Sequence, residues 1–114
     1  MDNLKDFIYI QENTLSKDFC NHCIQKFEID DRKCDGVFNN GNSGMPVVDN
    51  AVKQSTDLYI SSESDWNEES LTFDKSLSKH YESYVDKTFS EEYKNDFHAR
   101  SKGFQIQRTK PGQF

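Results

Sequence analysis

The sequence predicts a small α+β domain. Two amphipathic stretches with helical spacing alternate with three short runs of β-branched and aromatic residues. The predicted order is strand, helix, loop, strand, helix, strand, and three strands are too few to close a barrel or a sandwich. A chain of 114 residues allows one domain at most, and its 13% of aromatic residues indicate that it folds.

The composition excludes several classes of protein. Twenty acidic residues against fourteen basic ones give a formal charge of −6, which argues against binding to nucleic acids or to anionic membranes. The longest apolar run is FIYI at residues 7–10, so no predicted helix can span a bilayer. The start of the chain has no signal-peptide pattern, and three cysteines form no disulfide framework. We therefore expect a cytoplasmic protein in a reducing compartment.

The first two predicted elements are a strand and a helix. Residues 7–10 predict a strand that is buried on both faces, or nearly so. Residues 15–30 predict a helix with Ser16 as its N-cap and Asp18 in its first turn, where the helix dipole favours an anion. The apolar stripe of this helix consists of Phe19, Cys20, Cys23, Ile24 and Phe27.

The middle of the chain predicts a long loop, a strand and an acidic turn. Residues 30–50 show neither the helical nor the strand spacing of hydrophobic residues and are rich in Gly and Asn. A loop of this length is usually functional or disordered. Residues 52–62 then predict a strand, because Asp57, Tyr59 and Ser61 alternate with Leu58 and Ile60. Residues 62–70, SESDWNEES, predict a turn.

The last third of the chain predicts a long helix and a strand. Residues 71–97 have helical spacing, with an apolar stripe of Phe73, Leu77, Tyr81, Tyr84, Val85 and Phe89. Residues 104–109 then alternate, so that Gln105, Gln107 and Thr109 point to one face of the strand. A sharp turn at Pro111 and Gly112 follows. Because polar side chains on one strand face are costly to bury without partners, this face suits a polar pocket lined by a sheet.

Several motifs have a structural explanation that we prefer. Cys20 and Cys23 form C-x-x-C but lie on the apolar stripe, as buried core cysteines do. A zinc site that adds Cys34 and His22 matches no standard zinc module. His80 and Glu82 form H-x-E, but residues i and i+2 of a helix point about 200° apart. The acidic run at residues 63–69 lacks the ligand ladder of a calcium loop, and His98 stands alone in a polar stretch.

A substrate-binding strand is the better functional candidate. Residues 53–57, KQSTD, lead a strand directly out of the Gly- and Asn-rich loop. A strand edge beside a loop is a suitable place to hold a substrate, because loops on a rigid scaffold carry much of the binding in proteins.

The C-terminal stretch resembles a known family. FQIQRTKPGQF at residues 104–114 is similar to the strand and turn before the iron-binding motif of 2-oxoglutarate/Fe(II)-dependent dioxygenases of the prolyl 4-hydroxylase type. In that family an alternating strand ends in Tyr, a turn x-x-Gly-Gln follows, and an aromatic residue and H-x-D come shortly after. Thr109 falls at the position of the Tyr, residues 110–113 match the turn, and Phe114 leads toward the motif.

Two further stretches carry the same resemblance. VKQSTDLYI at residues 52–60 resembles the family's V-R-x-S strand, with Lys53 in place of the Arg. LSKDFCNHCIQKFE at residues 15–28 resembles its opening helix. The resemblance therefore covers nearly the whole chain in the family's order.

The resemblance implies an enzyme with a double-stranded β-helix, or jelly-roll, fold and support helices, of which residues 1–114 are the N-terminal half. It implies that Fe(II) is held by two His and one carboxylate and that 2-oxoglutarate is decarboxylated while a C–H bond of a peptide side chain or small molecule is hydroxylated. It places Thr109, Gln107 and Gln105 at the cofactor, and Lys53 and Ser55 at the substrate. It implies that the missing C-terminal half is a partner.

The iron ligands implied by the resemblance lie beyond residue 114. We therefore expect no catalytic residue and no metal ligand in residues 1–114, no tight binding of Fe(II) or 2-oxoglutarate, and no activity of this chain alone. One alternative is a non-enzymatic jelly-roll-like or α+β binding module of a virion or partner complex. Another is a zinc- or thiol-using protein built on Cys20, Cys23 and Cys34.

Overall fold

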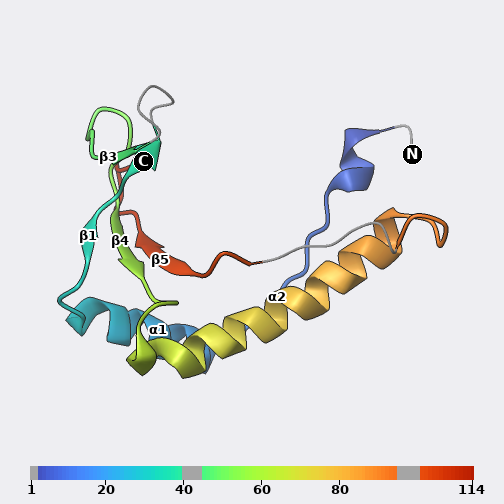
Figure 1. The fold of residues 1–114 in the computed structure, drawn as a ribbon, viewed down its shortest axis with the longest axis horizontal. Coiled ribbons are helices and arrows are strands. Elements are labelled where there is room, and N and C mark those ends of the chain that lie inside the picture. The colour runs from blue at the N-terminus through green and yellow to red at the C-terminus, as the bar shows by residue number, and fades with distance from the viewer. Residues whose placement is uncertain (1–2, 40–44, 95–100) are drawn as a thin grey trace.

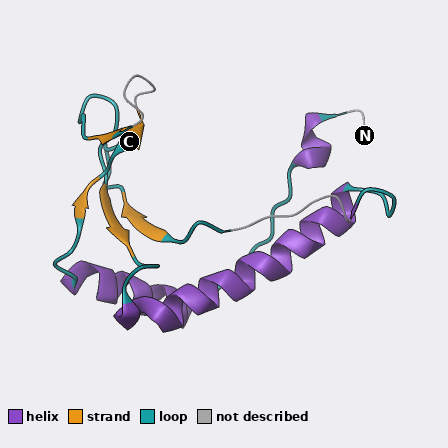
Figure 2. Ribbon diagram, viewed as in Figure 1, coloured by secondary structure: helices purple, strands orange, loops and turns teal. Residues whose placement is uncertain are grey.

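The computed structural model describes residues 3–39, 45–94 and 101–114, and it confirms a mixed α+β structure (Figures 1 and 2). Its helices are η1 (Leu4–Phe7), α1 (Lys17–Ile29), η2 (Ser64–Trp66) and α2 (Asn67–Thr88). Its strands are β1 (Cys34–Asp35), β2 (Phe38–Asn39), β3 (Pro46–Val47), β4 (Thr56–Tyr59) and β5 (Gln105–Arg108).

A three-stranded antiparallel sheet is the centre of the fold. Its strand order is β1-β4-β5, while β2 and β3 form a separate antiparallel pair. In the pairing of β4 with β5, Asp57 lies opposite Gln107 and Leu58 lies opposite Ile106. Because residues directly opposite each other share a sheet face, Asp57 and Gln107 lie on one face and Leu58 and Ile106 on the other.

The apolar core lies between the sheet face of Leu58 and Ile106 and the two long helices. The buried cluster joins Cys23 and Phe27 of α1 to Leu58, Ile60 and Trp66. Around it pack the partly buried side chains of Phe19, Phe73, Phe104 and Ile106. The helices therefore cover one face of the sheet, and no helix among the described residues covers the other face (Figure 1).

The structure confirms helix α1 and its start. Ser16 has an extended backbone, and its side chain accepts a hydrogen bond from the N–H of Phe19 at 3.1 Å, as an N-cap does. Asp18 lies in the first turn. The predicted stripe holds for Cys23 and Phe27, which are buried, whereas Ile24 is 57% exposed at the edge of the stripe.

The long helix α2 begins and ends earlier than predicted. The segment 62–70 is not a turn: it contains η2 and the first turn of α2, with Glu68 and Glu69 where the helix dipole favours acidic residues. Burial of Trp66 anchors this helix start. The helix ends at Thr88, because the backbone of Phe89 is extended; the N–H of Phe89 makes the last helical bond, to the carbonyl of Val85. The predicted helical residues 95–97 lie outside the described residues.

The predicted strand at residues 7–10 is wrong. Phe7 closes η1, and the chain then runs on without pairing to any strand that the structure describes. Ile8 and Ile10 are 59% and 80% exposed, while Tyr9 packs its ring against Tyr84 of α2 at 6.4 Å. The β-branched composition favours extended backbone, but a strand also needs a partner.

The predicted loop at residues 30–50 contains three short strands. β1 pairs with β4, with Cys34 opposite Asp57 and Asp35 opposite Thr56. β2 and β3 pair with each other, with Phe38 opposite Val47. Strands of two residues are too short to show a period in the sequence, which is why the pattern indicated only a loop.

The molecule has an open shape. The radius of gyration of its Cα atoms is 17.1 Å, whereas a compact chain of this length has about 13 Å. Figure 1 shows the reason: the C-terminal part of α2 extends away from the sheet, beside the N-terminal segment. In the described part of the chain, no helix combines the length and the apolar character needed to cross a membrane.

Candidate functional site

The candidate site is the face of β4 and β5 that the helices leave free. Asp57 and Tyr59 of β4 lie opposite Gln107 and Gln105 of β5. Cys34 of β1 lies opposite Asp57. This face therefore carries a carboxylate, a phenol and two carboxamides next to one another, all of which form hydrogen bonds.

Asp57 is the buried centre of this face. Its side chain is 2% exposed and forms an ion pair with Lys53 at 3.4 Å, between Nζ and Oδ2. The hydroxyl of Ser55 donates to the other carboxylate oxygen, Oδ1, at 2.9 Å. A buried carboxylate is stable only when it is paired and hydrogen-bonded, and these two partners meet that requirement.

The same cluster fixes the chain that leaves β1. The ammonium group of Lys53 also donates to the carbonyl of Val37 at 3.4 Å, and the N–H of Gly36 donates to the carbonyl of Ser55 at 3.0 Å. A Cβ atom at Gly36 would overlap Ser55 Oγ and lie 3.0 Å from Lys53 Cε. Glycine at this position therefore allows the backbone to pack directly on both side chains.

The five residues predicted at the cofactor and the substrate are placed differently by the structure. Lys53 and Ser55 come together on Asp57, where Ser55 is buried and Lys53 is partly buried. Gln105 and Gln107 lie on the same sheet face but are exposed, and Thr109 follows β5 and is also exposed. Their roles at a cofactor or substrate stay predictions.

Asp57 lies within the predicted substrate-binding stretch 53–57, but its pairing with Lys53 and Ser55 was not predicted. A signal was present, because Lys53, Ser55 and Asp57 are spaced two residues apart and share one face of an extended chain. A lysine, a hydroxyl and a carboxylate on one face can satisfy one another when the face is buried. The alternation was used to locate the strand and not to pair its polar side chains.

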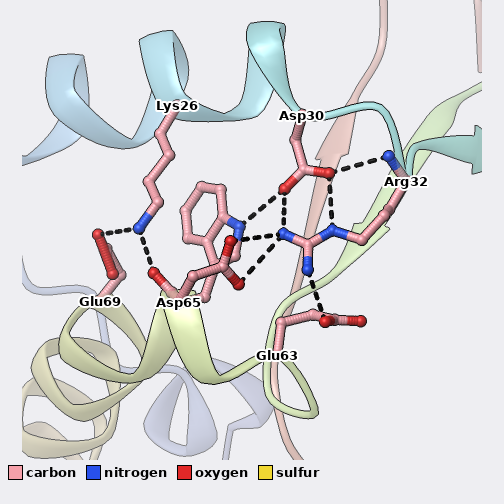
Figure 3. Close-up of polar contacts among 7 residues, drawn as sticks. Lys26, Asp30, Arg32, Glu63, Asp65 and Glu69 are labelled. Atoms are coloured by element: carbon pink, nitrogen blue, oxygen red, sulfur yellow. Dashed lines mark hydrogen bonds and ion pairs between the residues drawn. The ribbon is translucent and has the colours of Figure 1, made fainter.

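A network of ion pairs holds α1 against the start of α2 (Figure 3). Arg32 binds Asp30 at 2.6 Å, Glu63 at 2.6 Å and Asp65 at 2.9 Å. The hydrogen bonds from Arg32 hold the pKa of Asp30 well below its usual range, and the indole N–H of Trp66 adds a bond to the same carboxylate. This network was not predicted, because its members belong to segments interpreted as a loop and a turn.

Glu69 forms the second link between α1 and α2. Its carboxylate oxygen Oε1 binds Lys26 at 2.8 Å and His22 at 2.9 Å. Burial by itself would raise the pKa of Glu69, but the hydrogen bonds from Lys26 and His22 lower it to about 2. His22, which faces away from the apolar stripe, is thus a link between the helices.

The cysteines lie in three different environments. Cys23 is buried, Cys20 is half-buried and Cys34 is exposed, and all three are free thiols. Burial, with the nearby charge of Glu69, raises the pKa of Cys23, so this thiol is less reactive than an ordinary one. His80 and Glu82 lie within α2, whose helical geometry separates their side chains.

The described side chains do not form a binding site for iron. Within residues 3–39, 45–94 and 101–114, no three His, Cys, Asp or Glu side chains lie close enough together to hold a metal ion. The carboxylate of Asp57, which lies on the candidate face, is already bound by Lys53 and Ser55.

Comparison of the chain with protein-family models, with curated proteins and with solved structures finds no match.

Proposed function

We propose that this chain is the N-terminal part of a 2-oxoglutarate- and Fe(II)-dependent dioxygenase of the prolyl 4-hydroxylase type, which hydroxylates a peptide side chain or a small molecule. The order of the motifs in the sequence suggests the family. The observation that carries the proposal is the two-sided sheet, in which α1 packs on the face of Leu58 and Ile106, while Gln105 and Gln107 lie on the opposite, polar face.

A jelly roll has two sheets that face each other, with the residues between them enclosed. A second sheet over the polar face of β4 and β5 would turn this face into the wall of a closed site. Helices α1 and α2 would then be the support helices on the outside.

The chain's own residues would bind and position, not perform the oxidation. Gln105, Gln107 and Thr109 are exposed and present amide and hydroxyl groups that can donate to a carboxylate such as those of 2-oxoglutarate. Asp57 would hold Lys53 and Ser55 in place at the substrate side. Because iron has no site among the described residues, its ligands would come from the C-terminal half.

The experiment reads the coding sequence downstream of Phe114 and assays the encoded protein with Fe(II) and 2-oxoglutarate for succinate. An aromatic residue followed within a few codons by H-x-D, together with iron-dependent formation of succinate, supports the proposal. A reading frame without this motif contradicts it and favours the non-enzymatic binding module. So does a folded protein that has the motif and forms no succinate.

A further inference from the structure

A polar cleft lies at one end of the three-stranded sheet. Its volume is about 240 Å³, and it forms where β1 ends, β4 begins and the chain after β5 turns back. The backbone bond from Gln54 N–H to the carbonyl of Phe114 closes this end, and Figure 1 shows the C-terminus there. Every residue that lines the cleft is polar: Asp35, Asn50, Gln54, Ser55, Thr56 and Gln113.

Two residues of the cleft, Asp35 and Gln54, have a side-chain oxygen without a partner among the described residues. The amide nitrogen of Gln54 donates to the carbonyl of Asn50 at 2.9 Å, and its Oε1 oxygen has no hydrogen-bond partner among the residues that the structure describes. These two side-chain oxygens can each accept hydrogen bonds from a ligand.

Asp35 gives the cleft its charge. It is exposed at the end of β1, and within the described part of the chain its carboxylate makes no hydrogen bond or ion pair. The nearby Lys53 does not neutralise it, because the ammonium group of Lys53 binds Asp57 and the carbonyl of Val37. The formal charge of −6 of the whole chain adds to the attraction of a cation.

We propose that this cleft binds a guanidinium group, either of an arginine side chain in a polypeptide or of a small free guanidine. A guanidinium is planar, carries five N–H donors and matches a carboxylate with two parallel hydrogen bonds. Asp35 accepts this pair of bonds, and the Oε1 oxygen of Gln54 accepts a further N–H group. The cleft's chemistry does not depend on a hydroxylase activity, so binding is tested without turnover.

The experiment titrates the 114-residue chain with two guanidinium probes and follows backbone and side-chain amide signals by NMR. Nα-acetyl-L-arginine amide represents the side chain of a polypeptide, and agmatine represents a free guanidine. We expect saturable shifts of Asp35 and of residues 50–56. The corresponding citrulline derivative, which has the same shape and no charge, is expected to bind about tenfold more weakly, since a charge-assisted hydrogen bond is lost.

Variants test the carboxylate directly. Asp35→Asn keeps the shape of the side chain and is expected to weaken both guanidinium probes about tenfold, while leaving the weak binding of citrulline unchanged. Asp74→Asn removes one exposed charge from α2 as a control and is expected to bind like the original chain. Equal binding of the arginine and citrulline derivatives would overturn the proposal, as would unchanged binding by Asp35→Asn or the absence of saturable shifts with either probe.

Discussion

At the scale of single residues, the buried cluster of Asp57, Lys53 and Ser55 stabilises the sheet face that the helices leave uncovered. Asp57 is a fully buried carboxylate, and its two partners, Lys53 and Ser55, come from the same stretch of chain. A buried charge is costly unless it is paired, so this small cluster is stable as a unit and not as separate residues. The backbone at Gly36 rests on it.

Replacing Asp57 by Ala is expected to lower the free energy of unfolding by about 2 kcal/mol or more, because the ammonium group of Lys53 loses its partner. Urea denaturation followed by the fluorescence of Trp66 measures this, since Trp66 is the single, fully buried tryptophan. Asp74→Asn on exposed α2 is the control and should change stability by less than about 0.5 kcal/mol. Equal stability of the two variants would contradict the role of Asp57.

Gly36→Ala is expected to destabilise the protein by about 1–3 kcal/mol, because the added methyl group overlaps the Ser55 hydroxyl. A double-mutant cycle with Ser55→Ala tests the cause. Removal of the hydroxyl makes room for the methyl group, so the cost of Gly36→Ala should fall by at least about 0.5 kcal/mol in the Ser55→Ala background. Strictly additive effects would show that the two positions do not touch.

At the scale of elements, α1 and the start of α2 are joined by ion pairs as well as by the apolar core. Lys26 illustrates both, since its ammonium group binds Glu69 at 2.8 Å and lies 4.5 Å from the centre of the Trp66 ring. Figure 3 shows Arg32 among the carboxylates of Asp30, Glu63 and Asp65. These contacts set the position of the helix layer on the sheet.

Glu69 makes the stability of this link depend on pH. Its pKa is lowered from 4.5 to about 2, so its contribution is fully present above about pH 4.5 and is lost as the pH falls through 2. We expect Glu69→Gln to be less stable than the original chain at pH 6, by about 2 kcal/mol, and the difference to shrink between pH 4.5 and 2. Urea denaturation at each pH measures it.

Glu68→Gln is the matched control for this series, because Glu68 lies in the same first turn of α2 but is exposed. Its difference from the original chain should stay small at every pH. A stability difference for Glu69→Gln that does not change with pH would contradict the assigned role of Glu69.

The elements that could be predicted are those with a clear helix cap or with a repeated spacing of hydrophobic residues. Ser16 and the apolar spacing gave α1, and the alternations around Leu58 and Ile106 gave β4 and β5. β1 to β3 could not be predicted, because their pairing partners and not their own patterns define them. Residues 7–10 show the converse case, in which a strong strand composition has no partner strand among the described residues.

The candidate site was predicted in outline. Strand parity placed Gln105 and Gln107 on one face, and the register of β5 with β4 shows that Asp57 shares it. The pairing of Lys53 with Asp57 could not be derived from the alternation alone, because it also needs the chain at Gly36 and Val37 to cover both side chains.

At the scale of the whole molecule, the proposed function places the iron ligands in a second layer over the polar face of β4 and β5. Calorimetric titration of the 114-residue chain with Mn(II), as a substitute for Fe(II), is therefore expected to show only weak, non-stoichiometric binding. The reason is that no group of three ligands is assembled in the described parts of the chain. A tight one-to-one site would contradict this expectation and would favour a metal site within these residues.

The most direct test of the central claim is the rate of iron-dependent succinate formation from 2-oxoglutarate by the protein encoded in the reading frame that contains this sequence. If the polar face is a wall of the site, Gln107→Ala should lower kcat/KM for 2-oxoglutarate about tenfold, through the loss of a hydrogen bond to a charged group. Gln25→Ala, an exposed glutamine of α1, should leave it unchanged. Equal rates for the two variants, or no succinate from the original protein, would contradict the claim.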